Sequence, residues 1–326
     1  MRSRVALATL GLAGLIAHAH AATPGPIAFV RNGGVYSIAP NGGVATRLTI
    51  ATDPHREPRF SPDGTRLLYS SERGEQWDLY VAAADGTGET ALTDDVLWER
   101  DARWAPDGSE VVYSSGGRLW TADVTTRQAI PLTSSGLYSS PRYSPDGSLI
   151  VAVNSHSFRD SAIEVVSGPE ATIALTTAVG YEFWPSWSPD GTRVAYARRP
   201  PAGDYRVWVV ALDGTGRARV SAGPGDDIEP AFSPATDAIA FIRALDETHD
   251  LFVHDLLTEQ TTQLTDYEGR GVQSFTWAPD GSQITFTRYR GGRPDLYVVD
   301  VNGTDVRRLT TTRAGETQPD WGSASI

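Results

Sequence analysis

One short motif repeats along most of the chain, and this repeat constrains the fold more than any other feature. Each copy is an aromatic residue, which we call the anchor, followed by Ser or Ala, Pro, Asp and Gly; the fifth copy reads Ser-Pro-Ala-Thr after its anchor, and the seventh is truncated. The anchors are spaced 44, 39, 44, 45, 45 and 44 residues apart, a period typical of a four-stranded propeller blade rather than of a helical solenoid. The anchors are Phe60, Trp104, Tyr143, Trp187, Phe232, Trp277 and Trp321.

Each repeat unit contains the signals of four strands. Pro-Asp-Gly predicts a tight turn after a short first strand, because Pro presets φ, Asp bonds its own backbone and Gly accepts a positive φ. A second strand begins seven residues after each anchor, a third follows with patterns such as Leu-Tyr-Val, and the outermost strand ends at Leu-Thr pairs. Helix signals are absent. The predicted continuous blades lie at about 58–93, 102–133, 141–176, 185–221, 230–265 and 275–310.

The two ends of the chain complete one further unit. Residues 27–49 match the second, third and fourth strands, and residues 318–321 match the missing first strand. We therefore predict an all-β fold over 22–326, a single seven-bladed β-propeller of four-stranded antiparallel blades whose N- and C-terminal strands share one blade. Closure matters because an open ring would expose two blade faces and unpaired sheet edges.

The combination of Phe/Trp-Ser-Pro-Asp-Gly, Leu-Tyr-Val and Leu-Thr resembles the repeats of the TolB-type propeller family. The resemblance covers essentially the whole chain after residue 21, and it implies export to the periplasm and a protein-binding role. We expect the resemblance to be limited to the propeller, without the α/β domain that precedes it in TolB, and we expect seven blades where TolB-like propellers have six. Similar repeats occur in propeller domains of peptidases and in oligosaccharide lyases, so the resemblance indicates the fold better than the function.

Composition narrows the classes of function. The chain has 28 basic and 40 acidic residues, a formal charge of −12 and no Lys, so nucleic acid is not an expected partner. The absence of Cys excludes disulfides, thiolate nucleophiles and Cys-ligated metals. Arg2 and Arg4, the apolar run 5–17 and the sequence Ala-His-Ala at 19–21 predict a signal peptide over 1–21, cleaved near Ala21. We expect a periplasmic or secreted monomer with no membrane span.

The candidate site is predicted on one face of the ring. The Pro-Asp-Gly and Asp-Gly turns are expected on one face of the ring, which we call the turn face. The loops that join the second strand to the third, and the loops that join each outer strand to the next blade, are expected on the opposite face, which we call the loop face. Arg recurs eleven residues past the anchor, carboxylates recur three residues before it near the channel mouth, and aromatic residues occur between blades. This mixture is typical of a protein- or peptide-binding site. The predicted binding residues are Arg31, Arg198, Arg243, Arg288, Glu57, Asp101, Trp98, Tyr181, Trp184 and Glu229.

Other interpretations of these residues stay open. Arg at one repeat position can be a structural partner of a neighbouring blade's Asp, and the anchors other than Tyr143 are expected to be core wedges between blades. The alternative function is a metal-assisted saccharide lyase or hydrolase at the channel mouth, although no Gly-x-Ser-x-Gly elbow or other catalytic constellation is present. No cofactor is predicted, but the three predicted acidic residues could hold Ca²⁺ or another divalent cation. The weak candidates for metal ligands are His55, His156 and His249.

Overall fold

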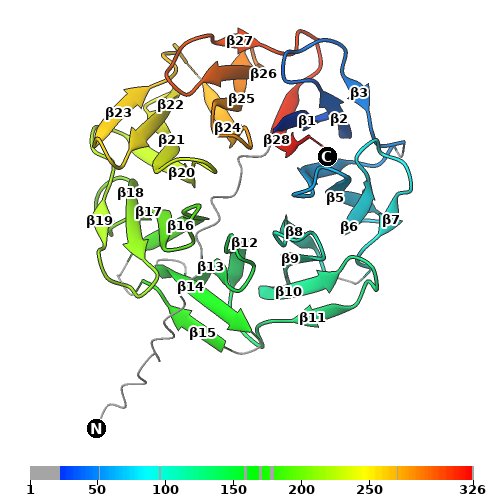
Figure 1. Cartoon of the computed structure of the whole chain (residues 1–326), viewed down its shortest axis with the longest axis horizontal. Helices are drawn as coiled ribbons and strands as arrows, with labels where there is room; N and C mark the ends of the chain where they lie inside the picture. The colour runs from blue at the N-terminus through cyan, green and yellow to red at the C-terminus, as the bar shows by residue number, and fades with distance from the viewer. Residues whose placement is uncertain are drawn as a thin grey trace.

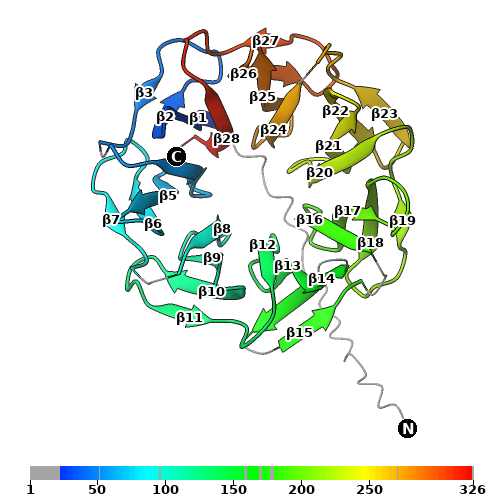
Figure 2. The ribbon, with the colours of Figure 1, turned by 180° about the vertical axis from the view of Figure 1, so that it is seen from behind.

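The strands of this computed structural model are arranged in a closed ring of four-stranded antiparallel sheets, with the first strand of each sheet nearest the centre (Figure 1; Figure 2 shows the ring from behind). The structure describes residues 23–50, 52–94, 97–157, 160–168, 171–176, 180–269 and 271–324, so the predicted signal peptide lies outside it. In these ranges no helix is long and apolar enough to cross a membrane. The seven sheets confirm the predicted all-β, seven-bladed propeller.

The six continuous blades each use four consecutive strands. The first two consist of β4 (His55–Phe60), β5 (Arg66–Arg73), β6 (Gln76–Ala83), β7 (Thr90–Ala91), β8 (Glu99–Trp104), β9 (Glu110–Ser115), β10 (Arg118–Asp123) and β11 (Ala129–Pro131). The next two consist of β12 (Tyr138–Tyr143), β13 (Ile150–Ser157), β14 (Asp160–Gly168), β15 (Ala171–Ala174), β16 (Tyr181–Trp187), β17 (Arg193–Arg199), β18 (Arg206–Ala211) and β19 (Ala218–Arg219). The last two consist of β20 (Asp226–Phe232), β21 (Ala238–Leu245), β22 (Thr248–Asp255), β23 (Gln260–Gln263), β24 (Val272–Trp277), β25 (Gln283–Arg290), β26 (Arg293–Asp300) and β27 (Arg307–Arg308).

The seventh blade is assembled from both ends of the chain. Its strand order is β28-β1-β2-β3, and Trp321 on β28 pairs in register with Ile27 on β1. The predicted closure by the two termini is therefore confirmed. The strands of this blade are β28 (Glu316–Ser323), β1 (Pro24–Arg31), β2 (Gly34–Ile38) and β3 (Thr46–Arg47).

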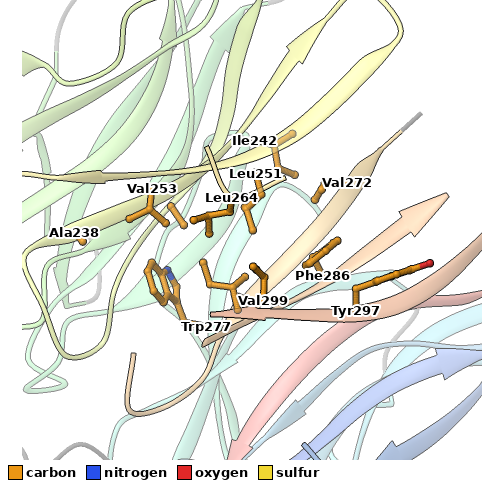
Figure 3. Close-up of a cluster of buried hydrophobic side chains, with 12 residues drawn as sticks. Ala238, Ile242, Leu251, Val253, Leu264, Val272, Trp277, Phe286, Tyr297 and Val299 are labelled. Carbon is orange, nitrogen blue, oxygen red and sulfur yellow. The ribbon is translucent and has the colours of Figure 1, made fainter. Parts of the chain in front are cut away.

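The apolar core is divided among the junctions between blades. Each of seven buried clusters combines residues from two neighbouring blades; in the cluster of Figure 3, Ile242 and Leu251 of one blade face Trp277 and Phe286 of the next. The anchors also bond across the junctions: the indole N–H of Trp277 donates to the Ala231 carbonyl at 3.1 Å. The anchors are thus the predicted core wedges, and burial of apolar area between blades holds the ring together.

The predicted turns form where the motif places them. The Gly64 N–H donates to the Ser61 carbonyl at 2.8 Å, and Asp63 Oδ1 accepts from the Thr65 N–H at 3.0 Å. Gly64 adopts φ +69°, a value that glycine tolerates best. These turns fix the direction of the strands that follow, and hence which loops share the loop face.

The innermost strands carry a feature that the sequence pattern did not predict. Six of the seven place a non-glycine residue at positive φ three positions before the anchor, and the pairing register shifts there in five of the continuous blades. Because this β-bulge interrupts the alternation, the innermost strands begin upstream of the starts expected from the sequence, for example at 55 rather than about 58. The residues at positive φ are Glu57, Asp101, Ser140, Trp184, Glu229 and Gln318.

Candidate functional site

The bulge residues link neighbouring blades through hydrogen bonds. The backbone N–H of Glu57 donates to Gln318 Oε1 at 2.8 Å, that of Asp101 donates to Glu57 Oε2 at 3.0 Å, and that of Ser140 donates to Asp101 Oδ2 at 3.1 Å. Each side chain therefore accepts from the next blade, which ties four consecutive innermost strands together. Glu57 and Asp101 have this structural role whether or not they contact a ligand.

Glu229 occupies the same bulge position on β20 but differs electrostatically. Burial raises the pKa of its carboxyl to about 7, although the positive charge of Arg142 acts in the opposite direction. A carboxylate removed from water without a close partner favours its neutral form. Near neutral pH this side chain therefore divides between protonated and ionised forms.

Three of the four predicted arginines form ion pairs between the innermost strand and the second strand of their blades. Arg31 Nε lies 2.9 Å from Glu316 Oε1, and Arg198 Nε lies 3.5 Å from Glu182 Oε1. Both carboxylates are fully buried, and burial raises the pKa of Glu182 even though nearby arginines oppose it. The guanidinium groups thus neutralise acidic residues inside their own blades, whereas the structural interpretation above expected the acidic partner in a neighbouring blade.

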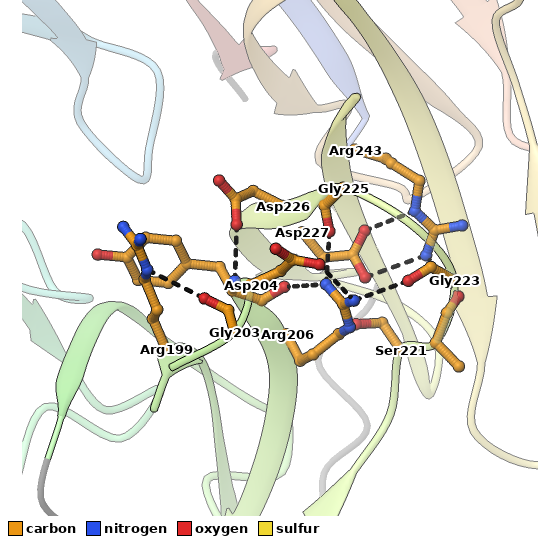
Figure 4. Close-up of polar contacts among 12 residues, drawn as sticks. Arg199, Gly203, Asp204, Arg206, Ser221, Gly223, Gly225, Asp226, Asp227 and Arg243 are labelled. Carbon is orange, nitrogen blue, oxygen red and sulfur yellow. Dashed lines mark hydrogen bonds and ion pairs between the residues drawn. The ribbon is translucent and has the colours of Figure 1, made fainter. Parts of the chain in front are cut away.

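Arg243 forms the most complete of these pairs. Its Nε and Nη2 lie 2.7 and 3.0 Å from the two carboxylate oxygens of Asp227, which is fully buried, and Nη2 also donates to the Ala222 carbonyl at 2.7 Å. Figure 4 shows this pair beside Arg206, which reaches the carbonyls of the same loop. The bidentate geometry fixes the guanidinium at the edge of the loop face.

Arg288 lies opposite Val272 of β24 rather than opposite a carboxylate, and its neighbour on β26, Asp295, forms its ion pair with Arg308. Its guanidinium instead lies over the ring of Tyr267, 3.5 Å from the ring centroid, with the Tyr297 ring 5.6 Å away. In all four blades the repeated guanidinium lies over an aromatic ring, and in three of them it also pairs with the carboxylate opposite it on the innermost strand.

Two predicted residues, Tyr181 and Trp184, come together with two that were not predicted as binding residues. Phe183 has ring centroids at 6.3 Å from Tyr181, 5.6 Å from Trp184 and 6.4 Å from Tyr205, and Trp184 and Tyr205 meet edge to face at 5.8 Å. All four side chains are partly exposed. We call Tyr181, Phe183, Trp184 and Tyr205 the aromatic cluster; it lies at the start of β16, on the loop face.

Trp98 lies on the same face in another blade. Its side chain is 61% exposed and borders a cavity of about 510 Å³ between the blades that begin at β4 and β8. Leu97 and Leu137, both exposed, lie on either side of the Gly116-Gly117 turn. The cavity is lined by Arg56, Glu57, Leu97, Trp98, Arg100, Asp101, Gly116 and Gly117.

The structure does not bring the three candidate histidines into one set of ligands. His55 is buried, its Nδ1 lies 2.9 Å from the Gly33 carbonyl oxygen, and burial lowers its pKa. His156 lies 3.8 Å from Glu164, and His249 lies 3.2 Å from a side-chain amide. Among the described residues, no three His, Cys, Asp or Glu side chains are grouped so that they could hold a metal ion.

The sequence interpretation missed one charged set. Arg59, Arg103 and Arg142 each stand one residue before an anchor, on the innermost strands of three consecutive blades. Two of them line a cavity of about 330 Å³ in the centre of the ring. The sequence does carry a signal for this set, namely Arg at a fixed repeat position, one residue before the anchor, in three consecutive units.

Comparison with known proteins gives both a family and a fold. A model of the TolB beta propeller domain matches residues 30–180 and 170–325. The chain is 26% identical over 253 residues to a protein TolB homolog of Chlorobium luteolum, which covers 63% of this chain and 55% of that protein. The chain thus spans about half of that relative's length.

Solved structures resemble the ring at low sequence identity. TolB from Acinetobacter baumannii has a TM-score of 0.62 and 18% identity, covering 84% of this chain and 69% of its own. An oligogalacturonate lyase in complex with manganese has a TM-score of 0.71 and 17% identity, covering 90% and 86%. At these identities the likeness establishes the fold alone.

Proposed function

Because the chain belongs to the TolB β-propeller domain family, we propose that it is a binding module that takes a protein or peptide partner on its loop face. The observation that supports this most is the aromatic cluster, four contiguous rings that are partly exposed beside the channel mouth. Aromatic side chains offer a large contact area at a small entropic cost and are enriched among the residues that dominate binding energy.

The position of Trp184 strengthens the argument. It stands at the bulge position, where the other blades carry a serine, a carboxylate or an amide side chain, so this blade presents an indole at the level of the interblade hydrogen bonds. Trp98 supplies a second apolar contact, with Arg56 and Arg100 in the wall of its cavity. Arg198, whose side chain is 20% exposed, lies across the hairpin from Glu182 and reaches the surface of the same loop face.

The proposal includes export. The segment 1–21 has the features of a signal peptide, and its removal near Ala21 would deliver the propeller to the periplasm or outside the cell. Both locations place the loop face among envelope or extracellular proteins.

The test is selection of peptides from a random phage library on the immobilised protein, followed by affinity measurement on the selected peptides. We expect Trp184→Ala and Trp98→Ala each to weaken binding at least about tenfold, the scale of a hot-spot aromatic residue. The matched control is Leu257→Ala, an equally apolar residue that is 81% exposed in the β22–β23 turn, on the turn face. Thermal melting identifies any variant that is destabilised; Trp98→Ala removes an exposed side chain and is expected to fold.

Two results would overturn this proposal. One is that the selected peptides keep their wild-type affinity for both loop-face variants. The other is that the purified protein contains a stoichiometric divalent metal and turns over an acidic oligosaccharide, and that Glu57→Gln loses both the metal and the turnover. That result would support the metal-assisted alternative instead.

A further inference from the structure

A second charged surface lies inside the ring, away from the loop-face residues. This surface is formed by the residues that stand one position before each anchor. They lie two positions nearer the turn face than the bulge residues. Three consecutive blades, those of β4, β8 and β12, place an arginine there, while the remaining four carry small or acidic side chains. In chain order the seven residues are Arg59, Arg103, Arg142, Ser186, Ala231, Thr276 and Asp320.

The three guanidinium groups are held in the same way. Nη1 of Arg59, Arg103 and Arg142 donates to the carbonyl of the preceding residue at 2.8, 2.7 and 2.8 Å. The carbonyls of Arg59 and Arg142 in turn accept the indole N–H of Trp104 and Trp187 at 3.1 and 3.0 Å. Both backbone and side chain are therefore oriented before any ligand arrives, which lowers the entropic cost of binding.

The positive charges are incompletely compensated. Arg59 Nη1 lies 3.7 Å from Asp320 Oδ1, whose other carboxylate oxygen accepts the Phe60 N–H at 2.8 Å. In the described part of the chain neither Arg103 nor Arg142 forms an ion pair, and neither guanidinium makes a hydrogen bond beyond the one to the carbonyl of the preceding residue. Of the five donors on each guanidinium, most remain for a ligand.

The surroundings penalise these charges. Burial lowers the pKa of Arg103 well below its ordinary value, and repulsion from Arg142 and Arg59 acts in the same direction. Burial lowers the pKa of Arg142 to about 10. Glu57 and Asp101 attract both arginines from the bulge level, but each already accepts a backbone N–H. An added anion would relieve the repulsion that remains.

The cavity beside these groups is of a size to take such an anion. Its volume is about 330 Å³, and it is lined from β4, β8, β24 and β28, with Arg59, Arg103 and Asp320 as its charged groups. We propose that this central cavity binds a carboxylate ligand, with the guanidinium forks of Arg59 and Arg103 as direct partners and Arg142 adding attraction from the next blade. The planar fork of arginine matches a carboxylate through two parallel hydrogen bonds.

Two kinds of ligand carry such a carboxylate: a small organic dicarboxylate and the C-terminus of a polypeptide. The probes are succinate and N-acetyl-alanyl-alanine, each compared with its neutral amide by calorimetric titration of the full chain at low ionic strength. We expect at least one acid to bind and its amide to bind at least about tenfold more weakly. Binding of succinate alone indicates the small anion, and binding of the acetylated dipeptide indicates a chain terminus.

Two variants locate the site. Arg103→Gln and Arg142→Gln should each reduce carboxylate affinity, Arg103→Gln by about tenfold or more, while Arg219→Gln, on the exposed strand β19, should leave it unchanged. Both channel variants should melt at or above the wild-type temperature, because each removes a charge disfavoured by burial and repulsion. The proposal fails if neither acid binds better than its amide, if inorganic phosphate binds as tightly as the acids, or if both variants retain wild-type affinity. None of these outcomes depends on the aromatic cluster.

Discussion

Arginine recurs at two repeat positions whose surroundings are opposite, one on the second strand and one on the innermost strand. At the loop-face end of the second strand, Arg243 lies directly across the hairpin from Asp227 and neutralises it. On the innermost strand, Arg103 lies across from Val112, and Arg142 lies across from Val151, both fully buried and apolar. The paired strand thus supplies a counter-charge at the first position and none at the second.

This difference separates a structural role from a role in binding. A guanidinium that already satisfies a buried carboxylate contributes to folding and has few donors left. A guanidinium whose neighbours are apolar pays a desolvation cost that only a ligand or a distant acid can offset. The two positions should therefore respond differently to substitution, and the predictions below test that difference.

The largest effect is expected where one strand provides partners to both kinds of arginine. Strand β28 carries Glu316, paired with Arg31, and Asp320, near Arg59. A chain that ends at Gly315 loses both partners and opens the ring, exposing two blade faces and the edge of β1. We expect loss of the cooperative thermal transition and aggregation, measured by circular dichroism and light scattering.

The control for this truncation ends at Ala324, so it keeps the whole of β28, which ends at Ser323. It should melt like the full chain. A cooperative transition at the wild-type temperature in the chain ending at Gly315 would contradict closure by β28.

The next effect in size concerns the paired class. Arg243→Ala leaves Asp227 buried without its bidentate partner, so we expect a loss of about 3–5 kcal/mol in the free energy of unfolding, measured by urea denaturation. Arg219→Ala, on an exposed outer strand, should cost less than about 0.5 kcal/mol. Combining Arg243→Met with Asp227→Leu should recover most of the loss. Equal stability of Arg243→Ala and the control would show that this position is not structural.

The bulge explains why the sequence did not distinguish these two classes. The repeat predicted the turns, the strands and the shared blade, because Pro-Asp-Gly and apolar patterning act locally. In a regular hairpin, the residue five positions before an anchor would pair with the residue twelve positions after that anchor. The bulge shifts the register by one residue, so Asp227, five before the anchor Phe232, pairs with Arg243, which is eleven after it. A shift of one residue moves a side chain to the other face of the sheet. The ion pairs therefore could not be predicted from the sequence without knowing the register.

The bulge itself gave no readable signal. Positive φ is usually marked by Gly or Asn, but here it is adopted by residues as different as Glu57 and Trp184. The hydrogen bonds between successive bulge residues hold this conformation, and such contacts depend on the closed ring rather than on local sequence. The aromatic cluster was predicted only in part for the same reason: Tyr205 joins it from a different loop.

The smallest expected effect is a dependence of the unfolding free energy on pH, caused by Glu229. Glu229 is a channel acid whose pKa is raised to about 7 by burial, so between about pH 4.5 and 7 the folded chain holds a proton that the unfolded chain has lost. Its contribution to stability is therefore present at low pH and is lost as the pH rises through 7. Relative to Glu229→Gln, the wild type should lose on the order of 1–2 kcal/mol of unfolding free energy between about pH 5 and pH 8. Glu247→Gln, exposed in the β21–β22 loop, should show no such difference. A pH-independent gap between wild type and Glu229→Gln would mean that the channel does not desolvate its charges, and the contrast between the two arginine positions would then lose its physical basis.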